Sequence, residues 1–479
     1  MDATPDGRIE LAIPTDSAAA FRQWFCFRAR GLTPRTRSFA LVNAGDATYA
    51  DAFVGYSVMA SYDQRRWFRV PTAFDGEVLE FEHAARAREV TYAYFAPYSL
   101  ERQERLLRRA ARSGLARVEV VGRSVQGRDM SVVVVGDEGR DDRRRIWVTA
   151  RQHPGETMAE WFMEGLLERL LDEDDEVARR LRGEAVLYLA PNLNPDGGFL
   201  GNLRTNAAGV DLNRTWDEPD EEGGPEVAAI RRAMHATGVD LFLDIHGDER
   251  YPYCFLAGSE GNPGYSERLR YLENLFEQSL LEFNADFQDE HGYDRDDPGQ
   301  GDLRCASNYV GEAFDCLAFT LEMPFKDNLN APDEVSGWSP DRSMHLGAST
   351  LDSVAVCLDD LRLLAVRGER EREDDGALLA LAVGGEGEGL DDRLHAGLHL
   401  VVDELADGAG GLDGLEGAVG LEDDLDAVLA LEARGVAAGH VVAAAEAVAV
   451  AGEGGGDLGL APAGVDGGAG GGGGDAERG

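Results

Sequence analysis

Lysine is nearly missing from this chain of 479 residues: Lys326 is the single example, and all other basic side chains are arginine or histidine. Acidic residues outnumber lysine plus arginine by 89 to 46, which gives a formal net charge of −43. Binding to nucleic-acid phosphates needs clustered positive charge. The composition therefore excludes a general electrostatic attraction to nucleic acid or to an anionic membrane, and we expect neither as a partner.

Long apolar runs and paired cysteines are also missing. No stretch of about 18 apolar residues occurs, and no basic segment followed by an apolar one opens the chain, so we predict a soluble, cytoplasmic protein. The cysteines are odd in number and include no Cys-x-x-Cys pair, which argues against a disulfide framework or a thiolate zinc site. They are Cys26, Cys254, Cys305, Cys316 and Cys357.

Aromatic, amide and hydroxyl side chains are absent from residues 358–479. The nine residue types present there can all be encoded by codons beginning with G or C, so a shifted reading frame in GC-rich DNA would produce this alphabet. A genuine acidic, glycine-rich disordered tail would have the same composition. On either reading we assign residues 367–479 no chemistry and exclude His395, His399 and His440 as ligands.

The first hundred residues have short, alternating, aromatic-rich segments separated by Gly, Asp and Asn turns. This pattern is typical of strands in a small antiparallel sandwich, which we predict for residues 1–100. The segments carry no cluster of histidine and carboxylate, so we interpret the domain as structural support, with partner docking as the alternative. They lie at 25–29, 39–42, 67–70, 78–81 and 90–95.

Residues 101–366 change to buried strands that alternate with amphipathic helices, which indicates an α/β domain with a mixed, mainly parallel sheet flanked by helices. We expect strands at 118–121, 130–135, 146–150, 186–190, 241–245 and 317–322. We expect helices at 157–171, 226–237, 266–283 and 350–364. In open sheets of this kind, ligand crevices form at the carboxyl ends of the strands.

Two of these strands end in potential metal ligands. His153 and Glu156 are three positions apart directly after the strand at 146–150, and His246 follows the strand at 241–245. Two histidines, one glutamate and an open position describe a catalytic zinc site, although cobalt or manganese could use the same ligands. We therefore predict one Zn²⁺ per chain.

The order of motifs resembles the zinc metallocarboxypeptidases of family M14, and the wording of three of them is similar to the cytosolic carboxypeptidase branch. The resemblance covers about residues 1–365 and rests on the segments HPGET, NPDG, GVDLNR, DIHGDE and TLEMPFKDN. It implies an amino-terminal β domain, a zinc-dependent hydrolase and a peptide or protein carboxyl terminus as substrate.

The resemblance also implies roles for further residues. Glu322 is the general base, and a carboxylate in an apolar strand points to function on its own. Arg204 stabilises the developing oxyanion, while Arg214 and the adjacent Asn213 bind the terminal carboxylate. Asp211 supports His153; from the residues alone, either Asp211 or Asp244 could orient a ligand histidine, and Asp244 could instead be a buried strand residue.

Two assignments rest on position along the chain. Tyr309, ahead of Glu322, is the nearest match to the tyrosine with which the family closes over substrate, and Tyr251 and Tyr253 are alternative pocket walls. Arg304 could attract an acidic terminal residue, or could be solvated in its charged surroundings.

Two other functions remain open at this point. The same ligands serve zinc amidohydrolases that act on acylated amino acids or cell-wall peptides, and a binding module could retain the fold without catalysis. The sequence leaves the oligomeric state open.

Overall fold

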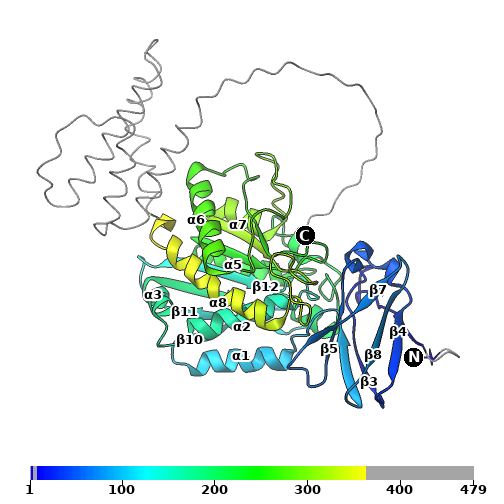
Figure 1. Ribbon diagram of the computed structural model, residues 1–479. Coiled ribbons are helices and arrows are strands. Elements are labelled where there is room, and N and C mark those ends of the chain that lie inside the picture. Colours follow the sequence, from blue (N-terminus) through cyan, green and yellow to red (C-terminus); the bar gives the residue numbers. More distant parts are fainter. Residues whose placement is uncertain (1, 4–7, 363–479) are drawn as a thin grey trace, which may run out of the picture. The chain divides into compact units, whose positions relative to one another are not determined.

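The computed structural model of the chain describes residues 2–3 and 8–362 (Figure 1), so the predictions for residues 367–479 lie outside the described residues. The described part has an amino-terminal β domain followed by a larger domain of strands and helices. This confirms the predicted fold class.

The β domain consists of two sheets, with strand orders β1-β2-β4-β8-β7 and β3-β9-β5-β6. Aromatic side chains fill the space between them: the rings of Phe39 and Phe81 from the first sheet lie 5.0 and 5.1 Å from that of Tyr92 in the second. The pairing is antiparallel except between β2 and β4, which are parallel. The strands are β1 (Asp2–Ala3), β2 (Ile9–Leu11), β3 (Cys26–Arg30), β4 (Thr36–Leu41), β5 (Val58–Ser61), β6 (Phe68–Val70), β7 (Thr72–Phe74), β8 (Leu79–Ala84) and β9 (Glu89–Ala93).

The larger domain is built on a seven-stranded sheet of order β10-β11-β13-β12-β14-β16-β15. Its four central strands are parallel and lie in the order β13-β12-β14-β16. Strands β10 and β11 at one edge and β15 at the other pair antiparallel with their neighbours. The strands are β10 (Ala116–Arg123), β11 (Asp129–Val135), β12 (Arg144–Ala150), β13 (Ala185–Ala190), β14 (Leu241–Ile245), β15 (Phe255–Ala257) and β16 (Leu317–Glu322).

Both faces of this sheet are buried, because successive side chains of a strand point to opposite faces. In β12, Ile146 and Val148 belong to one apolar core, while Trp147 belongs to another. Helices α2, α6 and α8 cover the first face, and α5 and α7 cover the second. The helices are α1 (Leu100–Arg112), α2 (Met158–Leu170), α3 (Glu176–Glu184), α4 (Pro195–Leu200), α5 (Pro225–Thr237), α6 (Glu267–Phe283), α7 (Ala306–Phe314) and α8 (Pro340–Cys357), with short 3₁₀ turns η1 (Ala44–Asp46), η2 (Ala50–Phe53) and η3 (Leu212–Arg214).

The last helix differs from its prediction. Helix α8 begins at Pro340, ten residues before the expected start, and ends at Cys357. Pro340 occupies the first turn, where its missing N–H costs nothing, and the side chain of Ser339 accepts a hydrogen bond from the N–H of Arg342 as the N-cap. This capping signal, rather than apolar periodicity, sets the start of the helix.

The β domain is joined to the larger domain through a half-buried arginine. Arg69, at strand β6, donates hydrogen bonds to the carbonyl oxygens of Phe325 at 2.8 Å, Trp338 at 2.9 Å and Ser336 at 3.2 Å. The ring of Tyr94 stacks on that of Phe325 with centroids 4.5 Å apart. The segment after strand β16 is therefore held by the β domain.

Candidate metal centre

The two candidate histidines leave the sheet at neighbouring positions. Strands β12 and β14 are paired in parallel, with Ala150 opposite Ile245. His246 follows Ile245 directly and His153 lies three residues after Ala150. Because parallel strands end at the same edge of a sheet, the register alone brings both loops together.

The loop that carries His153 is tightly constrained. Arg151 has a φ of +58°, which is uncommon for a residue other than glycine. Its guanidinium donates to the carbonyl oxygens of Pro154 and Tyr98, both at 3.0 Å, and forms an ion pair with buried Glu160. A backbone conformation of this kind costs about 1–3 kcal/mol and persists where the surroundings fix it.

Glycine is required at position 155. The N–H of Gly155 donates to the carbonyl oxygen of Leu203 at 2.7 Å, and a Cβ atom at Gly155 would lie 2.9 Å from that oxygen. The loop of His153 thus packs directly against the loop that carries Arg204.

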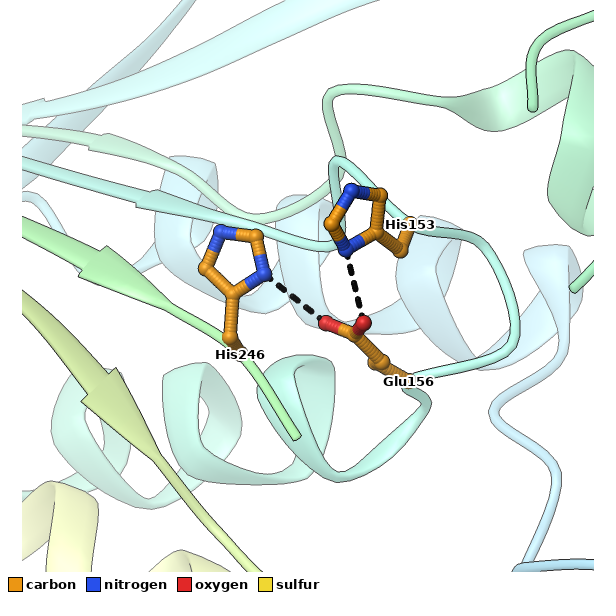
Figure 2. Close-up of side chains that lie close together, drawn as sticks. All are labelled: His153, Glu156 and His246. Carbon is orange, nitrogen blue, oxygen red and sulfur yellow. Dashed lines mark hydrogen bonds and ion pairs between the residues drawn. The ribbon is translucent and has the colours of Figure 1, made fainter. Parts of the chain in front are cut away.

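The three candidate ligands lie close together and are buried (Figure 2). One oxygen of Glu156 lies 2.7 Å from Nδ1 of His153, and the other lies 2.9 Å from Nδ1 of His246. One ligand atom from each residue can be chosen so that all three lie within 4.8 Å of one another. The Nδ1 atoms of both rings therefore face a common point.

The opposite ring nitrogens are each held by a second carboxylate. Nε2 of His153 lies 3.1 Å from Asp211, and Nε2 of His246 lies 2.8 Å from Asp244. Such contacts fix the tautomer and orientation of a metal-binding imidazole. Each aspartate therefore contacts one histidine. Asp244 is in addition a fully buried strand residue, which was the alternative role considered for it.

The charges of this cluster stabilise one another. Burial raises the pKa of Glu156, but the two imidazoles outweigh burial and bring it down to about 2. Burial lowers the pKa of His246, whereas Asp244 and Glu156 raise it well above its usual value. Two imidazole nitrogens, each ring held from behind by an aspartate, and one carboxylate oxygen are a donor set that zinc prefers.

Glu322 ends strand β16 beside this cluster. The side chain is buried, and its Oε2 atom has no hydrogen-bond partner among the residues that the structure describes. Burial raises the pKa of Glu322 well above its usual value, and although His246 lowers that pKa, Glu156 and Asp248 raise it further. A buried carboxylate with an open acceptor and a raised pKa is suited to proton transfer.

A tyrosine that no sequence motif indicated contacts Glu322. The hydroxyl of Tyr293 donates to Asp248 at 2.7 Å and lies 3.2 Å from Oε1 of Glu322. Tyr293 belongs to an irregular loop, so no helical or strand periodicity indicated its position. Asp248 appeared in the sequence only as part of the DIHGDE segment.

Tyr309 does not occupy this position. It lies on helix α7, and its hydroxyl contacts Nη2 of Arg231 at 2.5 Å and Nε2 of His235 at 3.0 Å, both on helix α5. The hydroxyl of Tyr309 thus contacts helix α5, and its expected role in closing over the substrate stays a prediction.

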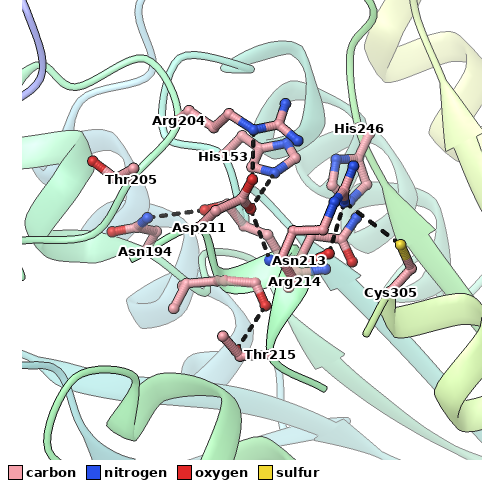
Figure 3. A network of polar contacts seen from close by, with 12 residues as sticks. His153, Asn194, Arg204, Thr205, Asp211, Asn213, Arg214, Thr215, His246 and Cys305 are labelled. Atoms are coloured by element: carbon pink, nitrogen blue, oxygen red, sulfur yellow. Dashed lines mark hydrogen bonds and ion pairs between the residues drawn. The ribbon is translucent and has the colours of Figure 1, made fainter. Parts of the chain in front are cut away.

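Arg204 is buried beside the zinc-ligand cluster (Figure 3). Its Nε donates to Asp211 at 2.6 Å and its Nη1 donates to the hydroxyl of Tyr49 at 2.9 Å. Burial lowers the pKa of Arg204, but Asp211 and Tyr49 raise it above its usual value. Asp211 thus contacts both His153 and Arg204, and its pKa is held low by these two groups against the effect of burial.

Asn213 and Arg214 follow Asp211 in the turn η3. The side-chain oxygen of Asn213 accepts a hydrogen bond from the N–H of Ala306 at 2.8 Å, which fixes the orientation of the amide. Nη1 of Arg214 donates to the carbonyl oxygen of Asn213 at 2.7 Å and lies 3.5 Å from Sγ of Cys305. Figure 3 shows both side chains on the same side of the network as His246.

Arg304 is exposed and already has a partner. Its guanidinium donates from Nε and Nη2 to the two oxygens of Asp302, at 2.9 and 2.8 Å. The side chain retains 58% of its accessible surface. The solvated reading of Arg304 therefore fits the structure better than a pocket for an acidic side chain.

Asn194, the first residue of the NPDG segment, has a structural role in this region. Its side chain caps helix α4 by accepting from the N–H of Gly197, and it donates to the carbonyl oxygen of Gln152 at 2.9 Å. Asn194 thus supports the residue that precedes His153.

Two family models match the chain. Residues 1–95 match the cytosolic carboxypeptidase N-terminal domain, and residues 104–343 match the zinc carboxypeptidase family. The chain therefore belongs to the M14 zinc carboxypeptidases, and the resemblance noted from the motifs is confirmed.

Individual relatives agree with this family. A metallo-carboxypeptidase structure from Pseudomonas aeruginosa is 52% identical, with a TM-score of 0.73, and the match covers 76% of this chain and 96% of that one. An uncharacterised protein of Zymomonas mobilis is 42% identical over 74% of this chain and 92% of its own length. Cytosolic carboxypeptidase 6 of Caenorhabditis elegans is 26% identical over 64% of this chain and 71% of its own length.

The protein is accordingly a metallocarboxypeptidase, a hydrolase of peptide substrates with one zinc ion as cofactor. The comparisons do not favour the amidohydrolase alternative. No helix among residues 8–362 is both long and apolar enough to cross a membrane.

Proposed function

We propose that the chain removes the last residue of peptides or proteins, with zinc held by His153, Glu156 and His246 and with Glu322 as the general base. The observation that carries this proposal is the buried cluster in which both Nδ1 atoms face Glu156 while both Nε2 atoms are held by aspartates. When bound, zinc supplies a Lewis acid that polarises a carbonyl group and makes water more acidic.

Glu322 handles the proton in this proposal. Its carboxylate accepts a proton from the attacking water and then delivers it to the nitrogen of the leaving amino acid. The Tyr293 hydroxyl contacts one oxygen of Glu322, which leaves the other oxygen to act as the acceptor. The raised pKa of Glu322 makes its carboxylate a stronger base, which favours uptake of the proton from the water.

Arg214 and Arg204 each interact with a different negative charge of the substrate. Arg214, with Asn213 beside it, binds the terminal carboxylate of the substrate, because a planar guanidinium pairs with a carboxylate through two hydrogen bonds. Arg204 stabilises the negative charge that develops on the carbonyl oxygen in the transition state. Its burial and its contact with Asp211 support this role, since a fixed charge in a buried site needs little reorganisation.

The direct test uses peptides that differ only at their last residue, each with a free carboxylate or a carboxamide at the end. Mass spectrometry should show loss of single terminal residues from the free acids, sensitivity to a zinc chelator, and no trimming of the carboxamides. Equal trimming of both forms would rule out recognition of the terminal carboxylate by Arg214. The same series tests the predicted preference for acidic terminal residues, and an Arg304→Ala variant shows whether Arg304 contributes to it.

Variants separate the base from the metal site. Glu322→Gln should retain zinc while kcat falls by about 10²- to 10⁴-fold, and His246→Ala should lose zinc. The exposed carboxylate of Glu104 provides the matched control, because Glu104→Gln removes a surface ion pair with Arg108 and should change neither quantity. Normal turnover by Glu322→Gln would remove Glu322 from the mechanism.

We also propose a cytoplasmic location, because relatives bear the name cytosolic carboxypeptidase. Fractionation of cells that express the tagged chain would test this, and recovery outside the cytoplasm would contradict it.

A further inference from the structure

One buried carboxylate of the β domain, Asp16, contacts the loop that carries Arg204. Asp16 accepts hydrogen bonds from three consecutive main-chain N–H groups: Leu203 at 2.6 Å, Arg204 at 3.1 Å and Thr205 at 2.9 Å. It also accepts from the hydroxyl of Thr205 at 2.8 Å. Asp16 is only 5% exposed, so these four donors replace its hydration.

A second contact from the β domain reaches the other end of Arg204. Tyr49 is also buried, and its hydroxyl accepts from Nη1 of Arg204 at 2.9 Å. The N–H of Tyr49 in turn donates to the side chain of Gln23 at 3.2 Å within the β domain. Both the main chain and the guanidinium of Arg204 are therefore fixed by residues of the β domain.

The remaining contacts of this region make the loop rigid. The N–H of Ser17 donates to Asn202 at 2.9 Å, and Asn202 donates to the carbonyl oxygen of Thr205 at 2.9 Å. Farther along the chain, a Cβ atom at Gly209 would lie 2.5 Å from the carbonyl oxygen of Ala18. The main chains of the two segments are thus too close for a side chain at position 209. The loop has little freedom to move relative to residues 16–18.

We infer that Asp16 and Tyr49 are positioning residues of the carboxypeptidase reaction: the β domain holds Arg204 where the developing oxyanion forms. This inference rests on the proposed role of Arg204. It assigns the β domain a part in catalysis, whereas its composition had indicated support or partner docking. The physical basis is that a charge aimed at a transition state is effective only while its position is fixed, since a displacement of about 1 Å can cost about 10²-fold in rate.

The test is a double-mutant cycle with zinc content measured for every variant. Arg204→Ala should lower kcat by about 10²- to 10³-fold. Asp16→Asn keeps the shape of the side chain but loses its charge and one acceptor, and Tyr49→Phe removes only the hydroxyl. Each should lower kcat by about 10- to 100-fold, with KM changed by less than about twofold and zinc retained.

The informative comparison is made in the Arg204→Ala background. If Asp16 and Tyr49 act through Arg204, their substitutions should lower kcat by less than about twofold once Arg204 is gone. A purely structural effect would instead multiply with that of Arg204→Ala and would appear in the urea midpoint. Asp75→Asn is the control, because Asp75 accepts two main-chain N–H groups in a turn of the β domain itself and should leave kcat unchanged.

The outcomes are distinguishable. If Arg204→Ala lowers kcat but Asp16→Asn and Tyr49→Phe do not, or if their effects multiply with it, the inference is overturned and the proposed function stands. If Arg204→Ala retains full kcat, the proposed role of Arg204 fails and the inference fails with it. Tyr49→Phe alone decides the question if Asp16→Asn does not fold.

Discussion

The contact between Asp244 and His246 leads to a quantitative prediction for Asp244→Asn. Asp244 is fully buried and accepts from three groups: the hydroxyl of Thr149 at 2.7 Å, the amide of Gln152, and Nε2 of His246 at 2.8 Å. Asparagine fills the same space, but it carries no charge and has one acceptor oxygen instead of two. At least one of the three donors therefore loses its acceptor.

The magnitude follows from the role of the lost contact. Removing a carboxylate behind a metal-binding histidine costs about 10- to 100-fold in metal affinity, which corresponds to about 1.4–2.7 kcal/mol. The upper part of this range applies here, because the substitution also removes the negative charge of Asp244. That charge keeps the ring proton of His246 on Nε2 and leaves Nδ1 free to bind the metal. We expect zinc affinity to fall by about 30- to 100-fold while the purified protein remains folded.

A chromophoric zinc chelator in competition with the protein measures this change at constant pH. Asp240→Asn is the control. Asp240 lies directly before strand β14, at the end far from His246, and pairs with Arg362, so its substitution should leave zinc affinity unaltered. An unchanged affinity in Asp244→Asn, or an equal loss in Asp240→Asn, would refute the reasoning that the aspartate orients the imidazole.

Three further predictions concern separate parts of the molecule. In Tyr293→Phe the hydrogen bond that lowers the pKa of Glu322 is gone, so the acidic limb of the kcat/KM–pH profile should move to higher pH with zinc retained; an unmoved limb would contradict the contact. Gly155→Ala forces a Cβ atom against the main chain of the neighbouring loop and should lower zinc affinity and kcat each by about tenfold or more, measured by the same competition and by peptide turnover, whereas wild-type values would show that the loop adapts. Burial and Glu260 raise the pKa of Glu273 to about 7, so its ionisation opposes folding progressively as the pH rises from about 4.5 to 7. Glu273→Gln should therefore raise the free energy of unfolding in urea by at most about 3 kcal/mol at pH 8 and by much less at pH 5, and an equal gain at both values would exclude this cause.

The metal cluster could be predicted because its signals are local. His153 and Glu156 follow one buried strand and His246 follows another, so the parallel sheet had to bring them to one edge. Strands β14 and β16 were predicted to the residue, since their apolar runs are bounded by polar or turn residues. The same locality made Glu322 conspicuous as a carboxylate within an apolar strand.

Other contacts could not be predicted from the sequence, because they have no periodic signal. Tyr309 was chosen by its distance along the chain, but the direction of its side chain depends on the turn of helix α7. Tyr293 reaches Glu322 from an irregular loop. Asp16 meets the N–H of Leu203 across 187 residues, and nothing in its immediate sequence indicates that partner.

The join between the β domain and the larger domain has a consequence for the order in which the chain is made. Amino-terminal domains begin to fold while the rest of the chain is still being synthesised. The carbonyl group of Phe325 lies 256 residues after Arg69, and the N–H of Leu203 lies 187 residues after Asp16. During this interval Arg69 and Asp16 lack these main-chain partners, and the ring of Tyr94 lacks its partner Phe325. The later loops supply main-chain hydrogen bonds to both charges, so the join is completed only after the segment that follows strand β16 has been made.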